Sequence, residues 1–295
     1  MKTARGKRVA RGSRHSVALA ATLACVLEAS AEKIGNVTPA RRFADSSFAD
    51  FVVSAVALGP AIAQAGPGRV GWAVWKSVAA CRRATATNAH LGVALLVSPL
   101  AAAWLASRGG GLRRRLAAIL RGLTVGDARW AYRAIRLANP GGLGRSGEAD
   151  VRGSPAITLR QAMALAAERD AIAWEYVHDF SITFELALPA LLAAAGKGLA
   201  LLDAIAQAHL ELMARLPDTL IMRKAGREAA EAVAAKAQAV IEAGGFYTRP
   251  GRRAGGRLDR ELRAEGHRLN PGTSADLIAA ALFVGLLEAD GRGLG

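Results

Sequence analysis

The sequence has few of the residues that build covalent cross-links or β-sheets. Cys25 and Cys81 are its only cysteines and do not form a CxxC pair, which excludes a disulfide framework and a zinc site of four thiolates. Aromatic residues make up 5% of the chain, and alternating runs of Val, Ile, Thr and aromatics are nearly absent. We therefore expect no sheet, and two buried free thiols in a reducing compartment.

Motifs of several enzyme classes are also missing. Neither HxxxH nor HExxH spacing occurs, so the histidines do not predict a zinc site. The chain has no GxSxG elbow and no GxxxxGK[ST] loop, which argues against a serine hydrolase and a P-loop kinase. Residues 142–147 satisfy GxGxxG, but a helical segment and a proline precede them where a dinucleotide site requires a strand.

Small aliphatic residues are abundant. Hydrophobic residues make up 52% of the chain and are mostly Ala, Leu and Val, and Ala and Leu are strong helix formers. Apolar runs such as 91–106 are shorter than the roughly 20 residues that a membrane span needs. We predict an all-α fold, a single-domain multi-helix bundle that does not enter a membrane.

Glycine and proline breaks divide this chain into helices. The longest irregular segment is 139–157, and we also expect a basic, glycine-containing loop over 244–256. A short basic helix should follow residue 111. The other predicted helices cover residues 16–32, 46–65, 88–105, 127–137, 158–176, 180–195, 198–215, 226–243, 256–266 and 277–289.

Three of these helices begin at capping patterns. Ser47, or Ser46 before it, can cap the helix over 46–65. Thr158 followed by Gln161 has the spacing of a capping box. Thr273 followed by Asp276 resembles another cap, which would open the last helix.

The first 32 residues resemble a secretory signal peptide. A basic head precedes the apolar run Val17–Leu27, and small residues follow at 29–31. However, Glu28 interrupts the pattern at once, and the helical spacing continues to Lys33. We predict a basic disordered tail over 1–14, a single helical domain over 15–290, and a cytoplasmic protein.

The formal charge of +15 raises the question of a nucleic-acid partner. The positive charge is concentrated in the tail and in residues 249–268, and neither stretch has the interleaved aromatics of a base-stacking surface. We expect no specific nucleic-acid binding, and favour a small substrate rich in phosphate. A solvated basic surface without a partner is the alternative.

Polar residues recur at the ends of the apolar helices, around residues 33–36, 87–92, 218–224 and 270–272. Burying such groups is costly unless they are paired or bind a ligand. Helix N-termini that meet in one cleft would supply N–H groups to an anion, and the glycine-rich stretch near 141–147 would let a phosphate approach the backbone. We predict a polar cleft at the helix ends, although each residue alone could be a cap.

Seven segments, in order, resemble the triphosphoribosyl-dephospho-CoA synthase family. Together they span about residues 20–290, far more than a single motif would. The matching segments are Leu23–Phe51, Thr87–Leu100, Asp127–Gly144, Asp150-Val151, Thr158–Tyr176, Pro217–Gly226 and Asn270–Phe283.

Three segments depart from the typical pattern of the family. The opening motif reads KIGNV at 33–37 where KPGLVD-like sequences are usual, 41–48 replaces a GAHxDMD-like stretch, and 88–92 lacks the lysine of NTHKG. The GNV and TN-x-x-LG forms are similar to a sister branch linked with methanopterin- or methanofuran-type one-carbon cofactors. These departures bear on the identity of the acceptor substrate more than on the chemistry of the nucleotide.

The resemblance implies a pentosyltransferase that moves the 5-triphosphoribosyl group of ATP to the 2′-hydroxyl of 3′-dephospho-CoA and releases adenine. A related ATP-dependent transfer in one-carbon cofactor biosynthesis is the alternative. The chemistry needs a base, a carboxylate near the anomeric carbon, and Mg²⁺ with cations for the triphosphate, but no organic prosthetic group. The oligomeric state is not predicted.

The resemblance and the helix-end positions select the candidate site residues. The candidates for catalysis are Asp150, Asp218 and His90. Those for substrate and phosphate binding are Lys33, Gly35, Asn36, Asn88, Arg136, Gly141, Gly142, Gly144, Arg223, Lys224, Asn270 and Gly272. Those for the metal are Asp45, Asp127, Asp150 and Asp276.

Overall fold

The computed structural model describes residues 13–87, 89–106, 110–141 and 149–289. Within these ranges the chain forms helices and turns, and its only strand-like pairings are two isolated bridges at Thr38–Arg41 and Phe43–Ser46. The predicted all-α, single-domain fold is confirmed. Residues 1–12 of the predicted tail lie outside the described ranges.

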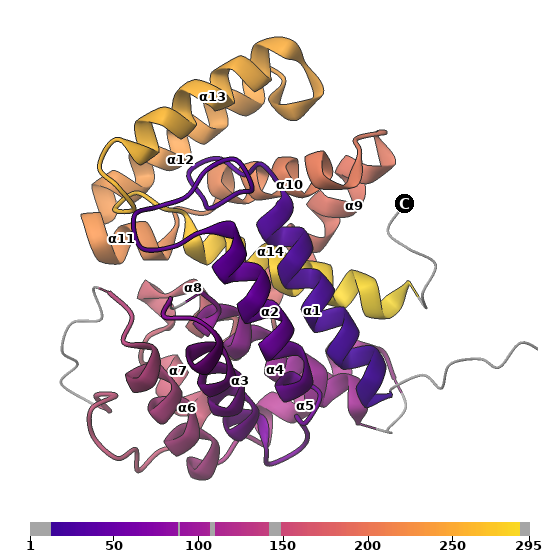
Figure 1. Cartoon of the computed structure of the whole chain (residues 1–295). Helices are drawn as coiled ribbons and strands as arrows, with labels where there is room; N and C mark the ends of the chain where they lie inside the picture. Colours follow the sequence, from indigo (N-terminus) through magenta and orange to yellow (C-terminus); the bar gives the residue numbers. More distant parts are fainter. Residues whose placement is uncertain (1–12, 88, 107–109, 142–148, 290–295) are drawn as a thin grey trace, which may run out of the picture.

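The helices follow one another with short connections (Figure 1). Short 3₁₀ turns occupy Ala167–Arg169 and Gly245–Tyr247, and a π-helical segment occupies Thr183–Ala187. The α-helices are α1 (Arg14–Ser30), α2 (Phe48–Ile62), α3 (Val70–Ala84), α4 (Leu91–Leu105), α5 (Leu112–Arg121), α6 (Val125–Ala138), α7 (Leu159–Ala164), α8 (Ala171–Val177), α9 (Leu188–Gly196), α10 (Leu201–Arg215), α11 (Thr219–Ala225), α12 (Arg227–Glu242), α13 (Arg249–Arg263) and α14 (Gly272–Glu288).

Helix α14 forms the centre of the molecule. It runs through the middle of the fold in Figure 1 and packs against α1, α4 and α10. Almost every residue from Ala275 to Val284 is buried, and α4 is buried over Gly92–Ala103. Helices that are apolar on every side are stable only inside a core. Because α4 and α14 are buried along most of their length, the core holds the first turn of each helix in a fixed position.

A second, smaller core lies beyond α10. Leu210 and Met213 of α10 pack with Ile221, Val233 and Leu258, which belong to α11, α12 and α13. Helices α12 and α13 form the outermost layer at the top of Figure 1. This layer packs on the segment after α1, because Ile34 joins the same cluster.

Capping residues in the sequence correctly indicated where several helices begin. Ser47 forms a reciprocal capping box with Asp50 at the start of α2, and Thr158 forms one with Gln161 at α7. Helix α1 is a core helix as predicted, since Val17 and Cys25 are fully buried. Cys81 is buried as well.

Other predicted boundaries were wrong. The helix expected over 158–176 is broken after α7, because Asp170 caps a separate helix, α8. The predicted cap of Thr273 and Asp276 does not form, since α14 already begins at Gly272 and has no side-chain cap. Helix α3 had no predicted counterpart. Its sequence of Trp, Lys and Arg among Val and Ala carries no cap signal, and no side chain caps it in the structure.

The predicted basic loop over 244–256 is mostly helical. Helix α13 begins at Arg249, with Thr248 as its N-cap and Pro250 in its first turn. Its glycines are packing residues, since a Cβ at Gly251 would collide with the backbone of Gly245 and one at Gly255 would press on Ile34. The glycine content of this segment suggested a loop. In the structure, Gly251 and Gly255 instead allow the helix to pack closely on its neighbours.

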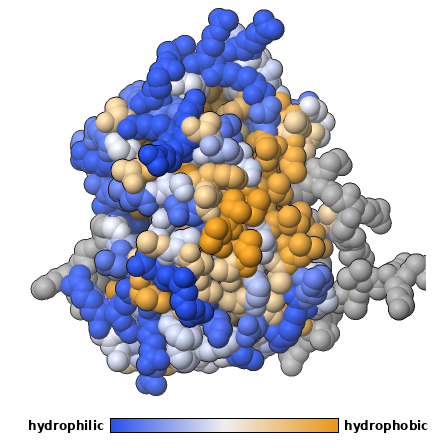
Figure 2. Space-filling model, viewed as in Figure 1, coloured by the Kyte–Doolittle hydropathy of each residue, from blue (hydrophilic) through white to orange (hydrophobic). Residues whose placement is uncertain are grey.

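No helix in the described part of the chain is both long enough and apolar enough to cross a membrane. The surface nevertheless has an apolar area, which Figure 2 shows in the middle of the face where Figure 1 places α1 and α2. Its exposed residues include Leu19 and Leu23 of α1 and Val53 and Val56 of α2.

Candidate functional site

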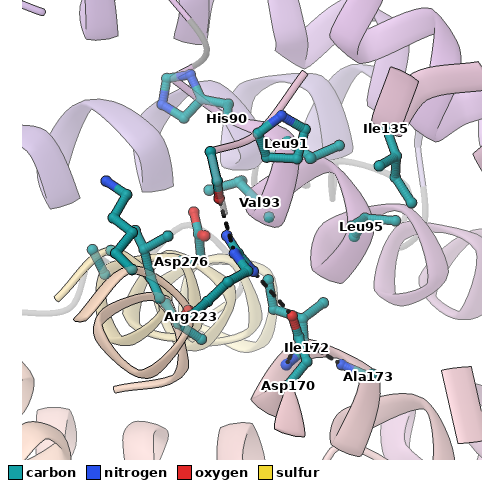
Figure 3. Close-up of a pocket in the computed structure, with 18 of the residues that line it drawn as sticks. His90, Leu91, Val93, Leu95, Ile135, Asp170, Ile172, Ala173, Arg223 and Asp276 are labelled. Carbon is teal, nitrogen blue, oxygen red and sulfur yellow. Dashed lines mark hydrogen bonds and ion pairs between the residues drawn. The ribbon is translucent and has the colours of Figure 1, made fainter. Parts of the chain in front are cut away.

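A cavity of about 970 Å³ lies where the ends of several helices meet. The first turns of α4, α8 and α14 line it, together with the last turns of α6 and α11 and Glu28 near the end of α1 (Figure 3). Its volume is at the upper end of the range for small-molecule sites. Carboxylates of the protein already accept from N–H groups at these three helix starts, since Asp276 binds Val93, Asp170 binds Ile172 and Ala173, and Asp218 binds Ser274.

The cavity brings together many of the candidates selected from the sequence. They come from segments far apart in the chain, as the prediction of a polar cleft at helix ends requires. The predicted residues that line the cavity are Asn36, Asp45, His90, Gly141, Asp150, Arg223, Lys224, Asn270, Gly272 and Asp276.

Arg223 is held on the cavity wall by two partners. Its Nε donates to the carbonyl oxygen of Gly141 at 3.1 Å, and its Nη1 lies 3.4 Å from Oδ2 of Asp170. Asp170 in turn accepts from the N–H groups of Ile172 and Ala173 and so caps α8. Figure 3 shows Arg223 between Asp170 and Asp276. The guanidinium is fixed in place while part of it remains accessible to a ligand.

Lys224 supplies a second cation next to Arg223. Its Nζ donates to the carbonyl oxygen of His267 at 3.2 Å. Partial burial, and then the neighbouring Arg223, lower the pKa of Lys224. A polyanion would relieve the repulsion between these two cations, so the pair is suited to phosphate groups.

Asp276 lies against the start of α4. A Cβ on Gly92 would overlap its carboxylate, and the N–H of Val93 hydrogen-bonds to it. Burial, followed by the nearby charges of Glu28, Asp218 and Asp170, raises the pKa of Asp276 well above its ordinary value. The glycine of the TN-x-x-LG motif thus makes room for a carboxylate from the distant α14.

His90 closes the wall of the cavity at the same place. Its Nδ1 lies 2.9 Å from Oγ of Ser54, and Phe51 packs edge-on against the ring at 5.4 Å between centroids. Burial lowers the pKa of His90 to about 4. The imidazole is therefore neutral at physiological pH and, being a weak base, is better suited to hydrogen bonding than to proton abstraction.

Lys33 does not reach the cavity. Its side chain is fully buried, and its Nζ lies 3.1 Å from Oε1 of Glu28 and also contacts the carbonyl oxygen of that residue. Glu28, which was not among the candidates, does line the cavity. The ammonium group of Lys33 is engaged in a buried ion pair, so the structure does not bring it to the cavity as the predicted phosphate contact requires.

Asp218 is likewise a structural carboxylate. Its Oδ1 accepts from the N–H groups of Leu220 and Ile221, and its Oδ2 accepts from the N–H and hydroxyl of Ser274 at 2.7 and 2.8 Å. It does not line the cavity. The structure shows a positional role, since Asp218 caps α11 and ties it to the first turn of α14, and does not bring it to the cavity as the predicted catalytic role requires.

Asp127 also lies outside the cavity. It forms a capping box with Thr124 at the start of α6, and its Oδ1 accepts from the N–H of Gly71 at 2.9 Å. These donors engage both carboxylate oxygens, and the structure does not bring Asp127 together with the other predicted metal ligands at the cavity. The carboxylate joins α6 to the start of α3.

Other candidates hold the cavity wall without facing it. Arg136 donates to the carbonyl oxygens of Val151 and Gly153, and the N–H of Gly35 donates to Asp259 at 2.8 Å. Neither lines the cavity, so direct substrate contact is not supported. Asn88, Gly142 and Gly144 lie outside the described residues.

Several polar residues of the cavity were not selected from the sequence. Glu28, Arg169 and Tyr132 are among those that line it. The signal for Glu28 was present, because a charge interrupting an otherwise apolar helix needs a partner. Arg169 lay in a matched segment next to Asp170, but the helix break that places both residues was not predicted.

The described residues contain no preformed group of three or more His, Cys, Asp or Glu side chains suited to a metal. Mg²⁺ often binds through one or two carboxylates and completes its octahedron with water and substrate phosphates. The separate carboxylates of Asp45 and Asp150, which are 64% and 25% exposed, fit that use. Asp276, also predicted as a metal ligand, instead contacts Gly92 and Val93 at the start of α4.

These features describe an all-α protein whose cavity combines cations with carboxylates. The sequence profile of the ATP:dephospho-CoA triphosphoribosyl transferase (CitG) family matches residues 14–293. The chain therefore belongs to this family, as the ordered segments predicted.

Curated relatives match over part of their length. A protein of Pseudomonas syringae pv. tomato is 38% identical over 111 residues, which is 38% of each chain, and one of Pseudomonas paraeruginosa is 42% identical over 95 residues, 32% of this chain and 30% of that one. Both are provisionally named 2-(5''-triphosphoribosyl)-3'-dephosphocoenzyme-A synthase. The alignments thus span less than two fifths of each relative.

A crystal structure from Archaeoglobus fulgidus is similar over a longer range. That protein, provisionally named a triphosphoribosyl-dephospho-CoA synthase, superimposes with a TM-score of 0.61 at 27% identity. The match covers 81% of this chain and 98% of the other. The helical architecture is therefore shared within the family.

Proposed function

We propose that this protein transfers the 5-triphosphoribosyl group of ATP to the 2′-hydroxyl of 3′-dephospho-CoA and releases adenine. The observation that carries the proposal is the cavity itself. It places Arg223, Lys224 and Arg169 near carboxylates and three helix starts in a chain of the triphosphoribosyl transferase family.

The residues divide by chemistry. Arg223 and Lys224 bind the triphosphate, whose negative charges match two adjacent cations. His90 is neutral and offers a hydrogen bond to a hydroxyl or to adenine. Asp45 and Asp150 are the residues that would hold Mg²⁺ arriving with ATP, and the ion would neutralise phosphate charge.

The test is incubation of the purified protein with ATP, Mg²⁺ and dephospho-CoA, with free adenine measured by chromatography. We expect adenine to form in proportion to dephospho-CoA, and the mass of the product to equal dephospho-CoA plus the triphosphoribosyl group. ATP binding without adenine release would overturn the proposed acceptor.

A second acceptor is favoured by one observation. The segments that depart from the usual family pattern contribute Asn36, Phe43, Ala89 and Leu91 to the cavity wall. Changes in the wall of a cavity alter which molecule fits it. The second candidate is therefore an ATP-dependent transfer to an acceptor of methanopterin- or methanofuran-type cofactor biosynthesis, tested by supplying such acceptors in the same assay.

A further inference from the structure

Glu28 is a charged residue in the wall of the cavity whose partner is hidden from the cavity. Its Oε1 lies 3.1 Å from Nζ of Lys33, and the side chain of Lys33 is fully buried. Glu28 is also almost fully buried, yet it lines the cavity. Among the described residues, no group hydrogen-bonds to its other carboxylate oxygen.

A buried ion pair is weak evidence for a stabilising role. Desolvation of both charges offsets their attraction, and apolar residues of similar volume often stabilise a fold equally well. The placement of this pair favours function, because it holds a carboxylate and its cationic partner at the wall of the cavity. A cation behind a carboxylate favours its charged form, while burial raises its basicity.

The other carboxylates of the cavity have partners that compete with such a role. Asp170 caps α8 and pairs with Arg223, and Asp276 faces the start of α4. Asp45 is exposed, and the half-buried Asp150 accepts from the N–H of Arg152. Among the described carboxylates of the cavity, Glu28 combines deep burial with an ion pair to a fully buried lysine.

We propose that Glu28 is the general base that removes the proton from the acceptor hydroxyl, and that Lys33 is the residue that positions it. This inference rests on the proposed transferase activity. Glu28 takes the hydroxyl proton while the hydroxyl oxygen forms a bond to C1′ of the ATP ribose. The C1′–N9 bond breaks and its electron pair leaves with adenine, which takes a proton from solvent, and Glu28 later returns its proton to solvent.

The groups around Glu28 set the pH range of this step. Burial raises the pKa of Glu28, and Lys33 lowers it in part. A base with a raised pKa is a stronger proton acceptor near neutral pH. Lys33 pairs with Glu28 directly, Cys25 on α1 and Asp276 on α14 interact with it electrostatically, His209 on α10 interacts with Lys33, and His90 at the start of α4 shares the cavity wall.

The experiment measures adenine release with and without dephospho-CoA for four proteins across a range of pH. These are the wild type, Glu28→Gln, Lys33→Met and the double variant. The double variant removes both charges with little change in volume, so it should fold even if Glu28→Gln alone leaves Lys33 unpaired and unfolds. Glu175→Gln is the matched control, because Glu175 is equally buried but lies outside the cavity.

We expect the wild-type rate to fall on the acidic side as Glu28 is protonated. Glu28→Gln and the double variant should lower acceptor-dependent release by roughly 100-fold or more and lose that acidic limb, while ATP affinity stays within about twofold. Lys33→Met should move the acidic limb to higher pH, a shift that a purely structural role would not produce. Glu175→Gln should keep the wild-type pH profile.

The outcomes distinguish failure of the proposed activity from failure of the proposed role of Glu28. If the wild type releases no adenine with dephospho-CoA, the proposed activity is overturned and the role of Glu28 with it. If the wild type is active and a folded double variant keeps its rate and acidic limb, the role of Glu28 alone is overturned.

Discussion

The backbone of Gly92 lies directly against the carboxylate of Asp276. Gly92 belongs to the first turn of α4 and Asp276 to the first turn of α14, so this contact sets the distance between the two buried helices where they reach the cavity. Only a residue without a side chain fits there. A Cβ would overlap the carboxylate and also press on Ile172.

Gly92→Ala should therefore lower the free energy of unfolding by about 1–3 kcal/mol, the usual cost of overpacking, and weaken ATP binding. Urea unfolding and calorimetric titration with ATP would measure the two effects. Gly196→Ala is the control, because an added Cβ at Gly196 in α9 meets no atom within 4 Å. Alanine there should be neutral or slightly stabilising, and equal behaviour of the two variants would contradict the packing argument.

Asp218→Asn should mainly cost stability. An amide supplies one acceptor oxygen where Asp218 uses two, and its NH₂ would face the N–H of Ser274 or of Leu220. We expect a loss of about 1–3 kcal/mol, read from urea unfolding, with little change in the ATP affinity of the folded protein. Asp203→Asn serves as control, since Asp203 forms an exposed pair with Arg252 that should contribute under about 1 kcal/mol. A large loss of ATP affinity at unchanged stability would restore a direct role for Asp218.

Arg223→Met and Lys224→Met should each weaken ATP binding. A charge-assisted hydrogen bond to a phosphate contributes about 1.5–3 kcal/mol, which corresponds to roughly 10- to 100-fold in Kd. Adenosine, which lacks the phosphates, should bind each variant as it binds the wild type. Arg252→Met on the exposed face of α13 tests for nonspecific charge effects. Equal losses for ATP and adenosine would contradict the assignment of these cations to the triphosphate.

Asp150→Asn tests the proposed Mg²⁺ contact. We expect the rate at low Mg²⁺ to fall roughly 100-fold, the scale of a lost electrostatic group at a reacting centre, and to recover in part at high Mg²⁺. The measurement is adenine release as a function of Mg²⁺ concentration, with chelator as the zero point. Asp203→Asn should follow the wild-type curve. A uniform loss at every Mg²⁺ concentration would assign Asp150 a role other than metal binding.

The features that could be predicted from the sequence are those that depend on residues close together in the chain. The capping boxes at Ser47 and Thr158 involve residues three apart, so they could be located without a structure. The cavity at the helix ends was predicted for the same reason, since polar residues that end apolar helices need partners. The family resemblance then selected many of the residues that line it.

Contacts between distant segments were not predictable in this way. Asp218 and Asp127 are polar residues at helix ends, as ligands would be, yet they also bind Ser274 and Gly71 of other helices. A local pattern such as that of Thr124 and Asp127 can indicate a cap, but it does not show which distant backbone group the same carboxylate binds. Only the packing of α11 on α14 and of α3 on α6 decides it.

Two buried histidines make stability depend on pH. Burial lowers the pKa of His90 to about 4 and that of His209 to about 3, from an ordinary value of 6.5. Below pH 6.5 the unfolded chain therefore binds protons that the folded chain does not. The contribution of these residues to stability is complete above pH 6.5 and is lost as the pH falls towards 4.

His209→Gln should reveal this dependence without a change in the cavity, because His209 does not line it. The wild type should exceed the variant in stability by the largest margin at pH 7.5, and the margin should shrink by about 1–2 kcal/mol by pH 5, at about 1.4 kcal/mol per unit of pH below 6.5. Buried carboxyls such as Asp276 act in the opposite direction, but they are common to both proteins and cancel in the difference. Urea unfolding at pH 7.5, 6 and 5 would measure the margin, and His178→Gln on the exposed end of α8 should show none of this trend. A margin that stays constant with pH would mean that His209 takes up a proton in the folded protein as readily as in the unfolded chain.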